Sequence, residues 1–135
     1  MSIVKHIDHL NLSVQNLEQT IDWYARIFDF QVVEAAEQGG QPWAILKAGE
    51  ALLCLYQRPE LPFIERKTRP VHGMNHLSYR ITDRSAWLHI LERESLPLNH
   101  GHELIYDHSV SWYVTDPTGY EIEVVLWKDD TVRFA

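Results

Sequence analysis

The feature that most constrains the fold of this chain is an internal repeat. Residues 74–83 follow the same pattern as residues 7–16. In each segment a His-Leu pair opens a stretch with the alternation of a strand, and a residue that can cap a helix closes it. The two histidines, His9 and His76, are 67 residues apart (76 − 9). A repeat of this length indicates duplication of a unit that cannot bury its sheet face alone, so the sequence predicts two similar halves.

The first half contains a predicted strand, a helix and three further strands. Apolar and polar residues alternate from position 3 to 14, and Asn16 then offers a cap for a helix. The apolar residues of this helix recur at helical spacing; they are Leu17, Ile21, Tyr24, Ala25 and Phe28. Strand-like segments follow at residues 30–37, 43–47 and 51–57, with glycine turn signals between them.

A linker separates the halves. Residues 58–73 contain three prolines and a run of charged side chains, which are Glu65, Arg66, Lys67 and Arg69. We interpret this run as a solvated loop. The alternative is that its arginines hold an anionic substrate.

The second half shows the same order of elements. A strand within residues 74–83 leads to a helix capped by Asp83 or Ser85, and strands follow within residues 97–105, 110–115 and 121–126. The sequence therefore predicts an α+β fold, with a single domain over residues 1–135 made of two repeats. The first module spans residues 3–57 and the second spans residues 74–127.

The composition narrows the class of partner. A formal charge of −7 argues against nucleic acid, whose phosphates require a basic surface. No apolar run approaches the ~20 residues that cross a bilayer, and the first residues do not have the pattern of a signal peptide. The single cysteine, Cys54, fits a reducing compartment. We therefore expect a cytoplasmic protein with a small-molecule partner and no membrane or nucleic-acid partner.

A turn and strand near the C-terminus carry two carboxylates on one face. Pro117 and Gly119 suit a tight turn, and β-branched and aromatic residues follow at strand spacing. Glu121 and Glu123 are two residues apart and so point the same way, while the apolar residues between and after them point to the core. A carboxylate in this place must be exposed, paired or bound to a cation.

Three residues in matching places of the repeat suggest a metal site. If a pseudo-two-fold axis relates the halves, His9 and His76 point into one cleft, and Glu123 faces it from the last strand. Two imidazoles and one carboxylate with open positions form a facial site for a divalent metal. Each residue taken alone is more often an exposed or paired side chain.

The segments that carry this pattern resemble the vicinal oxygen chelate superfamily, which includes glyoxalase I, extradiol dioxygenases, fosfomycin thiol transferases and bleomycin-resistance proteins. The matching pieces are residues 7–10, 21–24, 75–77 and 116–123. The resemblance implies a cupped cleft of eight strands. It also implies a divalent metal held by His9, His76 and Glu123, with Fe2+ favoured and Mn2+, Zn2+, Ni2+ or Co2+ as alternatives. Small members are usually homodimers, often with modules exchanged between the chains.

Two branches of the superfamily fit less well. Glyoxalase I enzymes carry a fourth ligand, a glutamate on the last strand of the first half, where this chain has Cys54 or, one residue away, Leu53. Fosfomycin thiol transferases place cations before the last hairpin, where residues 103–108 are acidic. A lyase or isomerase and a thiol transferase therefore remain as alternatives, as does a bleomycin-resistance-like protein that binds a drug without chemistry.

The second half looks most like an extradiol dioxygenase. Tyr113, ten residues before Glu123, falls where those enzymes keep a hydrogen-bond donor at the metal. His102 or His108 would match the histidine beside that tyrosine. Those enzymes also have an acid–base histidine whose equivalent here, near Leu61, is absent from the sequence. We expect dioxygenase-like chemistry.

Two aromatic residues of the first half are candidates for the substrate cleft. Trp43 and Tyr56 lie in predicted strands, where they either line the cleft or pack as ordinary core aromatics.

Overall fold

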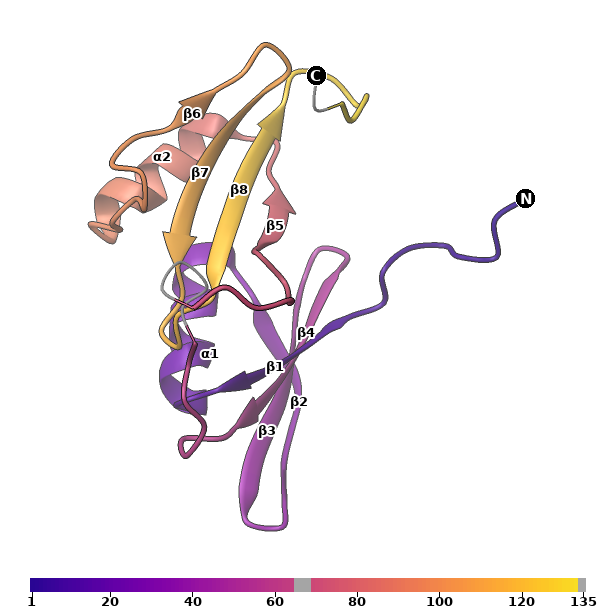
Figure 1. The fold of residues 1–135 in the computed structure, drawn as a ribbon, viewed down its shortest axis with the longest axis vertical. Helices are drawn as coiled ribbons and strands as arrows, with labels where there is room; N and C mark the ends of the chain where they lie inside the picture. Colours follow the sequence, from indigo (N-terminus) through magenta and orange to yellow (C-terminus); the bar gives the residue numbers. More distant parts are fainter. Residues whose placement is uncertain (65–68, 134–135) are drawn as a thin grey trace. The chain divides into compact units, whose positions relative to one another are not determined.

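The computed structural model of the chain describes residues 1–64 and 69–133, which form two compact units, Met1–Phe63 and Ile64–Ala135 (Figure 1). Three residues of the predicted linker cluster, Glu65, Arg66 and Lys67, lie outside the described residues. Arg69 is described and exposed.

The first unit is a four-stranded sheet with one helix. Its elements are β1 (Leu10–Val14), α1 (Leu17–Phe28), β2 (Gln31–Gln38), β3 (Gln41–Ala48) and β4 (Ala51–Gln57). The strand order is β1-β4-β3-β2, in which β1 runs parallel to β4 and the other neighbours are antiparallel.

The second unit repeats this topology. Its elements are β5 (Leu77–Arg80), α2 (Arg84–Arg93), β6 (Leu104–Ile105), β7 (Ser109–Thr115) and β8 (Glu121–Trp127). The strand order is β5-β8-β7-β6, again with one parallel pair, β5 and β8. The predicted α+β class and its two βαβββ modules are therefore confirmed.

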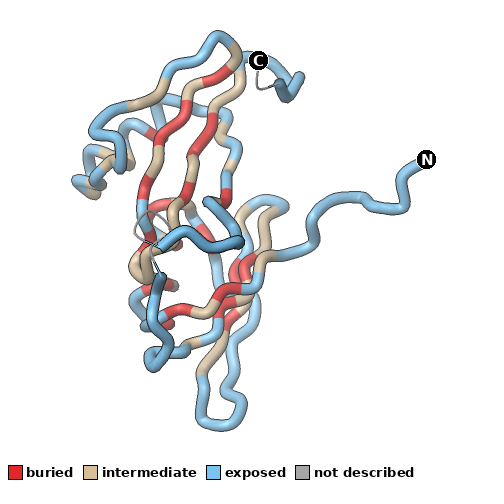
Figure 2. The backbone as a smooth tube through the Cα atoms, in the orientation of Figure 1, coloured by how far each residue is buried: buried red, intermediate tan, exposed pale blue. Residues whose placement is uncertain are grey.

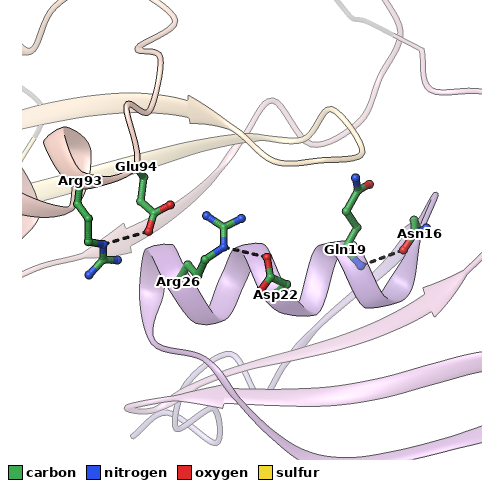
Figure 3. Close-up of polar contacts among 6 residues, drawn as sticks. All are labelled: Asn16, Gln19, Asp22, Arg26, Arg93 and Glu94. Atoms are coloured by element: carbon green, nitrogen blue, oxygen red, sulfur yellow. Dashed lines mark hydrogen bonds and ion pairs between the residues drawn. The ribbon is translucent and has the colours of Figure 1, made fainter.

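Both helices begin where the sequence predicts. The side chain of Asn16 accepts a hydrogen bond from the backbone N–H of Gln19 at 2.9 Å, and Arg26 binds Asp22 one turn earlier at 2.8 Å (Figure 3). Of the two candidate caps for α2, Asp83 is the one used, because it accepts from the N–H of Ala86 at 3.0 Å. Such caps satisfy N–H groups that the first turn of a helix leaves without partners.

The core of the first unit lies between α1 and its sheet. The helix packs on β3 and β4, and its buried residues Tyr24 and Ile27 face a layer of buried sheet residues, which are Leu12, Val14, Ala44, Leu46, Leu53 and Leu55. Figure 2 shows the corresponding alternation of buried and intermediate positions along these strands. Full burial of a side chain of this size contributes roughly 1.5–3 kcal/mol.

The core of the second unit is built around two tryptophans. Trp87 on α2 meets Trp112 on β7 edge to face, with ring centroids 6.5 Å apart. Val114, Ile122 and Val124 are fully buried on the same side of the sheet. The predicted apolar face of the last strand is thus its core face.

The first strand of each unit is shorter than its alternation predicts. β1 begins at Leu10, whereas the pattern extends back to residue 3. The reason is that its ladder with β4 begins at the pair Leu10–Leu53. β5 likewise begins at Leu77, which pairs with Ile122 near the start of β8. His9 and His76 therefore each stand one residue before a strand.

Candidate metal site and its surroundings

A rigid turn sets the start of β8. The carboxylate of Asp116 is buried, and its Oδ1 accepts hydrogen bonds from the N–H groups of Thr118, Gly119 and Tyr120 at 3.0, 2.9 and 2.9 Å. Gly119 has φ 126°, a conformation that strains other residues. This turn fixes the register in which Glu123 enters the sheet.

His76 and Glu123 face one another at the sheet surface. The Nε2 atom of His76 lies 3.0 Å from Oε2 of Glu123, and Ser111 donates a hydrogen bond to the other carboxylate oxygen at 2.6 Å. The two side chains are 32% and 18% exposed. The pair is therefore held in place but reachable from solvent.

Tyr113 completes this cluster. It stands opposite Glu123 across β7 and β8, and its ring meets the ring of His76 edge to face at 5.4 Å. Burial, followed by the charge and a hydrogen bond of Glu123, raises the pKa of Tyr113 to about 12. The phenol is thus neutral at neutral pH and can donate a hydrogen bond.

The His76–Glu123 pair offers two groups of a kind that bind metals. One imidazole nitrogen and one carboxylate oxygen are suitable donors for Fe2+ and Zn2+. Their 3.0 Å separation is that of a hydrogen bond between the two side chains. Within the described part of either unit, no third His, Cys, Asp or Glu joins such a group.

The predicted third ligand, His9, belongs to the first unit. It is exposed, and its Nδ1 lies 2.7 Å from a carboxylate oxygen of Asp8. A carboxylate on one ring nitrogen is the usual support for a histidine that binds metal through the other. The immediate surroundings of His9 thus fit the ligand role.

The histidine beside Tyr113 is His100, which no pattern in the sequence indicates. The ring of His100 meets Tyr113 edge to face at 5.0 Å. His102 instead contacts the backbone carbonyl of Glu103 at 2.7 Å, and His108 stacks between Tyr106 and Trp127.

Asn99 anchors the loop that carries His100. Its backbone N–H donates to the carbonyl of Tyr113 at 2.9 Å, and its side chain donates to Glu121 at 2.9 Å and accepts from Thr115 at 3.0 Å. These contacts tie the residue before His100 to both β7 and β8. No periodic pattern signals them, because they join a loop to strands more than a dozen residues away.

The two predicted substrate-binding aromatics pair with one another in the first unit. Trp43 and Tyr56 stand opposite across β3 and β4, with ring centroids 6.3 Å apart. Tyr56 also borders an open depression of about 520 Å³, whose wall includes Asn11 and Gln41.

The sheet register shows which residue replaces the fourth glyoxalase I ligand. Asn11 pairs with Cys54 in the first unit as Ser78 pairs with Glu123 in the second, and Asn11 and Ser78 are equivalent in the repeat. Cys54, not Leu53, is therefore the counterpart of Glu123. Burial, with a smaller effect of Asp8, raises the pKa of Cys54, so the thiol stays protonated.

Two units of one βαβββ topology, each with a histidine just before its first strand, point to one class of protein. The chain belongs to the glyoxalase/bleomycin resistance protein/dioxygenase superfamily, whose family model matches residues 6–124. This confirms the resemblance from the sequence. Among the described residues, no helix has the length and apolar character to cross a membrane.

Individual relatives are distant. The chain is 28% identical to a catechol-2,3-dioxygenase of Bacillus subtilis over 125 residues, 88% of this chain but 40% of that protein. It is 23% identical to the metallothiol transferase FosB of Staphylococcus haemolyticus over 124 residues, 90% of this chain and 84% of that protein. The chain thus spans about two fifths of the dioxygenase and most of the transferase.

The fold is also that of a solved structure. A glyoxylase/bleomycin resistance protein/dioxygenase domain from Frankia sp. superimposes with a TM-score of 0.78 at 16% identity, covering 95% of this chain and 96% of that one. At this identity the likeness supports the fold alone.

Proposed function

We propose that this protein is a divalent-metal-dependent enzyme whose small substrate chelates the metal through two oxygens. The ligands are His9, His76 and Glu123, and Fe2+ is the favoured ion because two histidines and a carboxylate are its common facial set. The observation that carries the proposal is the His76–Glu123 pair, 3.0 Å apart beside a neutral Tyr113.

The side chains of the site have separate roles. The metal, when bound, supplies Lewis-acid stabilisation of a substrate oxyanion. Tyr113 donates a hydrogen bond to a substrate oxygen, for which its raised pKa keeps the proton available. Ser111 holds one oxygen of Glu123, and the other would be available to a bound ion. Asp8 orients His9 in the same way.

Dioxygenase-type chemistry on a catechol is the preferred reaction. The catechol-2,3-dioxygenase relative supports it, as does the place of Tyr113 next to the ligand pair. The sequence offers no acid–base histidine near Leu61, but His100 lies against Tyr113 and is a suitable proton carrier. His102 and His108, which the sequence suggests, are the other candidates for the proton carrier.

Thiol transfer is the second candidate. The chain covers 84% of the FosB relative. The sequence suggests that the acidic residues 103–108 would repel an anionic substrate. This repulsion is weaker than expected, because Arg84 binds both carboxylate oxygens of Glu103 at 2.9 and 2.8 Å.

The proposed ligands come from both units, which bears on the assembly. His9 and the His76–Glu123 pair belong to different units, so the unit that supplies His9 comes from the same chain or from a second copy. We propose a homodimer in the cytoplasm, with Trp43 and Tyr56 against the substrate.

Reconstitution with Fe2+ under anaerobic conditions tests the proposal. On adding catechol and air, the protein should consume dioxygen, and the variants His76→Ala and Glu123→Ala should not. Transfer of a thiol to fosfomycin in place of oxygen uptake would favour the second candidate. Failure of both reactions, with tight drug binding by metal-free protein, would contradict an enzymatic role.

A further inference from the structure

The side chain of Asn99 bridges two strands at a point where they pair with one another. Thr115 on β7 stands opposite Glu121 on β8. The amide nitrogen of Asn99 donates to Oε2 of Glu121 at 2.9 Å, and its amide oxygen accepts from the Thr115 hydroxyl at 3.0 Å. With the bond from its backbone N–H to the carbonyl of Tyr113, three hydrogen bonds fix both the backbone and the side chain of Asn99.

The loop that follows Asn99 is attached to β7 at both of its ends. Asn99 is bonded to Tyr113, and Leu104 pairs with Ser111 where β6 meets β7. The two attachment points on β7 are two residues apart, a distance of about 7 Å along a strand. Residues 100–103 therefore fold back between two fixed ends.

Two further contacts restrain the loop between these ends. The N–H of Gly101 donates to the carbonyl of Leu98 at 3.0 Å, and Gly101 has φ 75°, which glycine adopts without strain. Arg84 on α2 binds both carboxylate oxygens of Glu103, at 2.9 and 2.8 Å. The backbone on either side of His100 is thus restrained by hydrogen bonds.

These restraints matter because His100 is exposed. A segment with few buried contacts opens easily, and an exposed side chain on it changes rotamer freely. The edge-to-face contact of His100 with Tyr113, at 5.0 Å between ring centroids, therefore depends on where the loop backbone is held. Asn99 is the neighbouring residue and has the most hydrogen bonds to the strands.

We propose that Asn99 is a positioning residue, which holds His100 against Tyr113 through its bonds to Thr115 and Glu121. The inference rests on the proposed function, in which Tyr113 donates a hydrogen bond to the substrate and His100 carries a proton. A displacement of about 1 Å at a reacting group can lower a rate about 10²-fold. Glu121, the first carboxylate of β8, then supports the loop and does not bind the metal.

NMR of the metal-free protein tests the positioning independently of any reaction. We expect a nuclear Overhauser effect between the ring protons of His100 and Tyr113 in the wild-type protein, and its loss in Asn99→Ala. Thr115→Val and Glu121→Ala, which each remove one partner of the amide, should weaken it. Thr115→Ser keeps the hydroxyl and Glu121→Gln keeps an acceptor, so these matched controls should retain it.

The metal-loaded enzyme then tests whether this positioning serves the reaction. Asn99→Ala should lower kcat about 10-fold to 100-fold, with KM and metal content unchanged. If Asn99 acts through His100, the two losses are not additive. The double variant Asn99→Ala/His100→Asn should therefore be no slower than His100→Asn alone.

Three results would overturn the inference: an unchanged Overhauser effect in folded Asn99→Ala, additive losses of kcat in the double variant, or full oxygen uptake in a variant that has lost the ring contact. Each of these would leave the proposed function standing. Loss of the ring contact in Asn99→Ala, with no oxygen uptake even by the wild-type protein, would instead contradict the proposed function while the positioning of His100 by Asn99 holds.

Discussion

At the scale of single residues, the candidate site consists of the carboxylate of Glu123, the imidazole of His76 and the side chains that hold them in place. Glu123 is held on one side by Ser111 and faces His76 on the other. Because a support of this kind orients a ligand, its loss weakens metal binding without removing a donor.

Ser111→Ala should therefore lower the affinity for Fe2+ by about 10-fold to 100-fold. Competition with a chelator of known affinity measures this. Ser78→Ala, on the neighbouring strand opposite Glu123, is the control and should change the affinity little. An unchanged affinity in Ser111→Ala would show that the hydrogen bond does not position the carboxylate.

Tyr113→Phe separates catalysis from metal binding. The variant keeps the ring that packs on His76 but has no hydroxyl to donate. We expect kcat to fall about 10²-fold to 10³-fold while metal content is unchanged. His100→Asn should give a smaller loss of kcat and a shifted pH profile. Full activity in Tyr113→Phe would remove the phenol from the mechanism.

At the scale of elements, a single buried side chain holds the last hairpin. Asp116 accepts three backbone hydrogen bonds in the turn before β8. Asp116→Ala leaves those donors without their acceptor and should cost about 2–4 kcal/mol in the free energy of unfolding. Urea denaturation measures this, with the exposed Asp107→Ala as control. Equal stability of the two variants would contradict the assigned role.

The strand β5 carries a tyrosine that should make the fold sensitive to alkali. Burial, and to a lesser extent the charge of Asp116, raises the pKa of Tyr79 well above its usual range. Below about pH 10 the phenol is neutral in both states, so its contribution to stability is complete. As pH rises further, the unfolded chain loses this proton first and folding is disfavoured.

Tyr79→Phe should therefore lose less stability above pH 10 than the wild type, by up to about 1.4 kcal/mol per pH unit. Guanidinium unfolding at pH 8 and at pH 10.5 gives the comparison. Parallel losses in both proteins would show that Tyr79 titrates normally.

The elements were predictable to the extent that they follow local rules. The caps Asn16 and Asp83 and the strand from 51 to 57 obey propensity and periodicity. The start of β1 does not, because the alternation extends back to residue 3 whereas pairing with β4 begins only at Leu10. His100 could not be found in this way, since a loop anchored by Asn99 delivers it to Tyr113.

At the scale of the whole molecule, the duplication explains why both units have the same topology. Each unit presents a histidine before its first strand, but only the second has a carboxylate in the paired position, where the first has Cys54. The repeat therefore predicts one asymmetric metal site with three ligands. The sequence alone indicated that His76 and Glu123 lie together. The structure adds the contacts of Ser111 with Glu123, of Asp8 with His9 and of His100 with Tyr113.

Metal stoichiometry in purified variants tests this central claim most directly. After saturation with Co2+ and removal of free ion, the wild-type protein and Cys54→Ser should each retain about one ion per chain. His9→Ala, His76→Ala and Glu123→Ala should each retain far less. A full ion in any of these three, or none in the wild-type protein, would contradict the account.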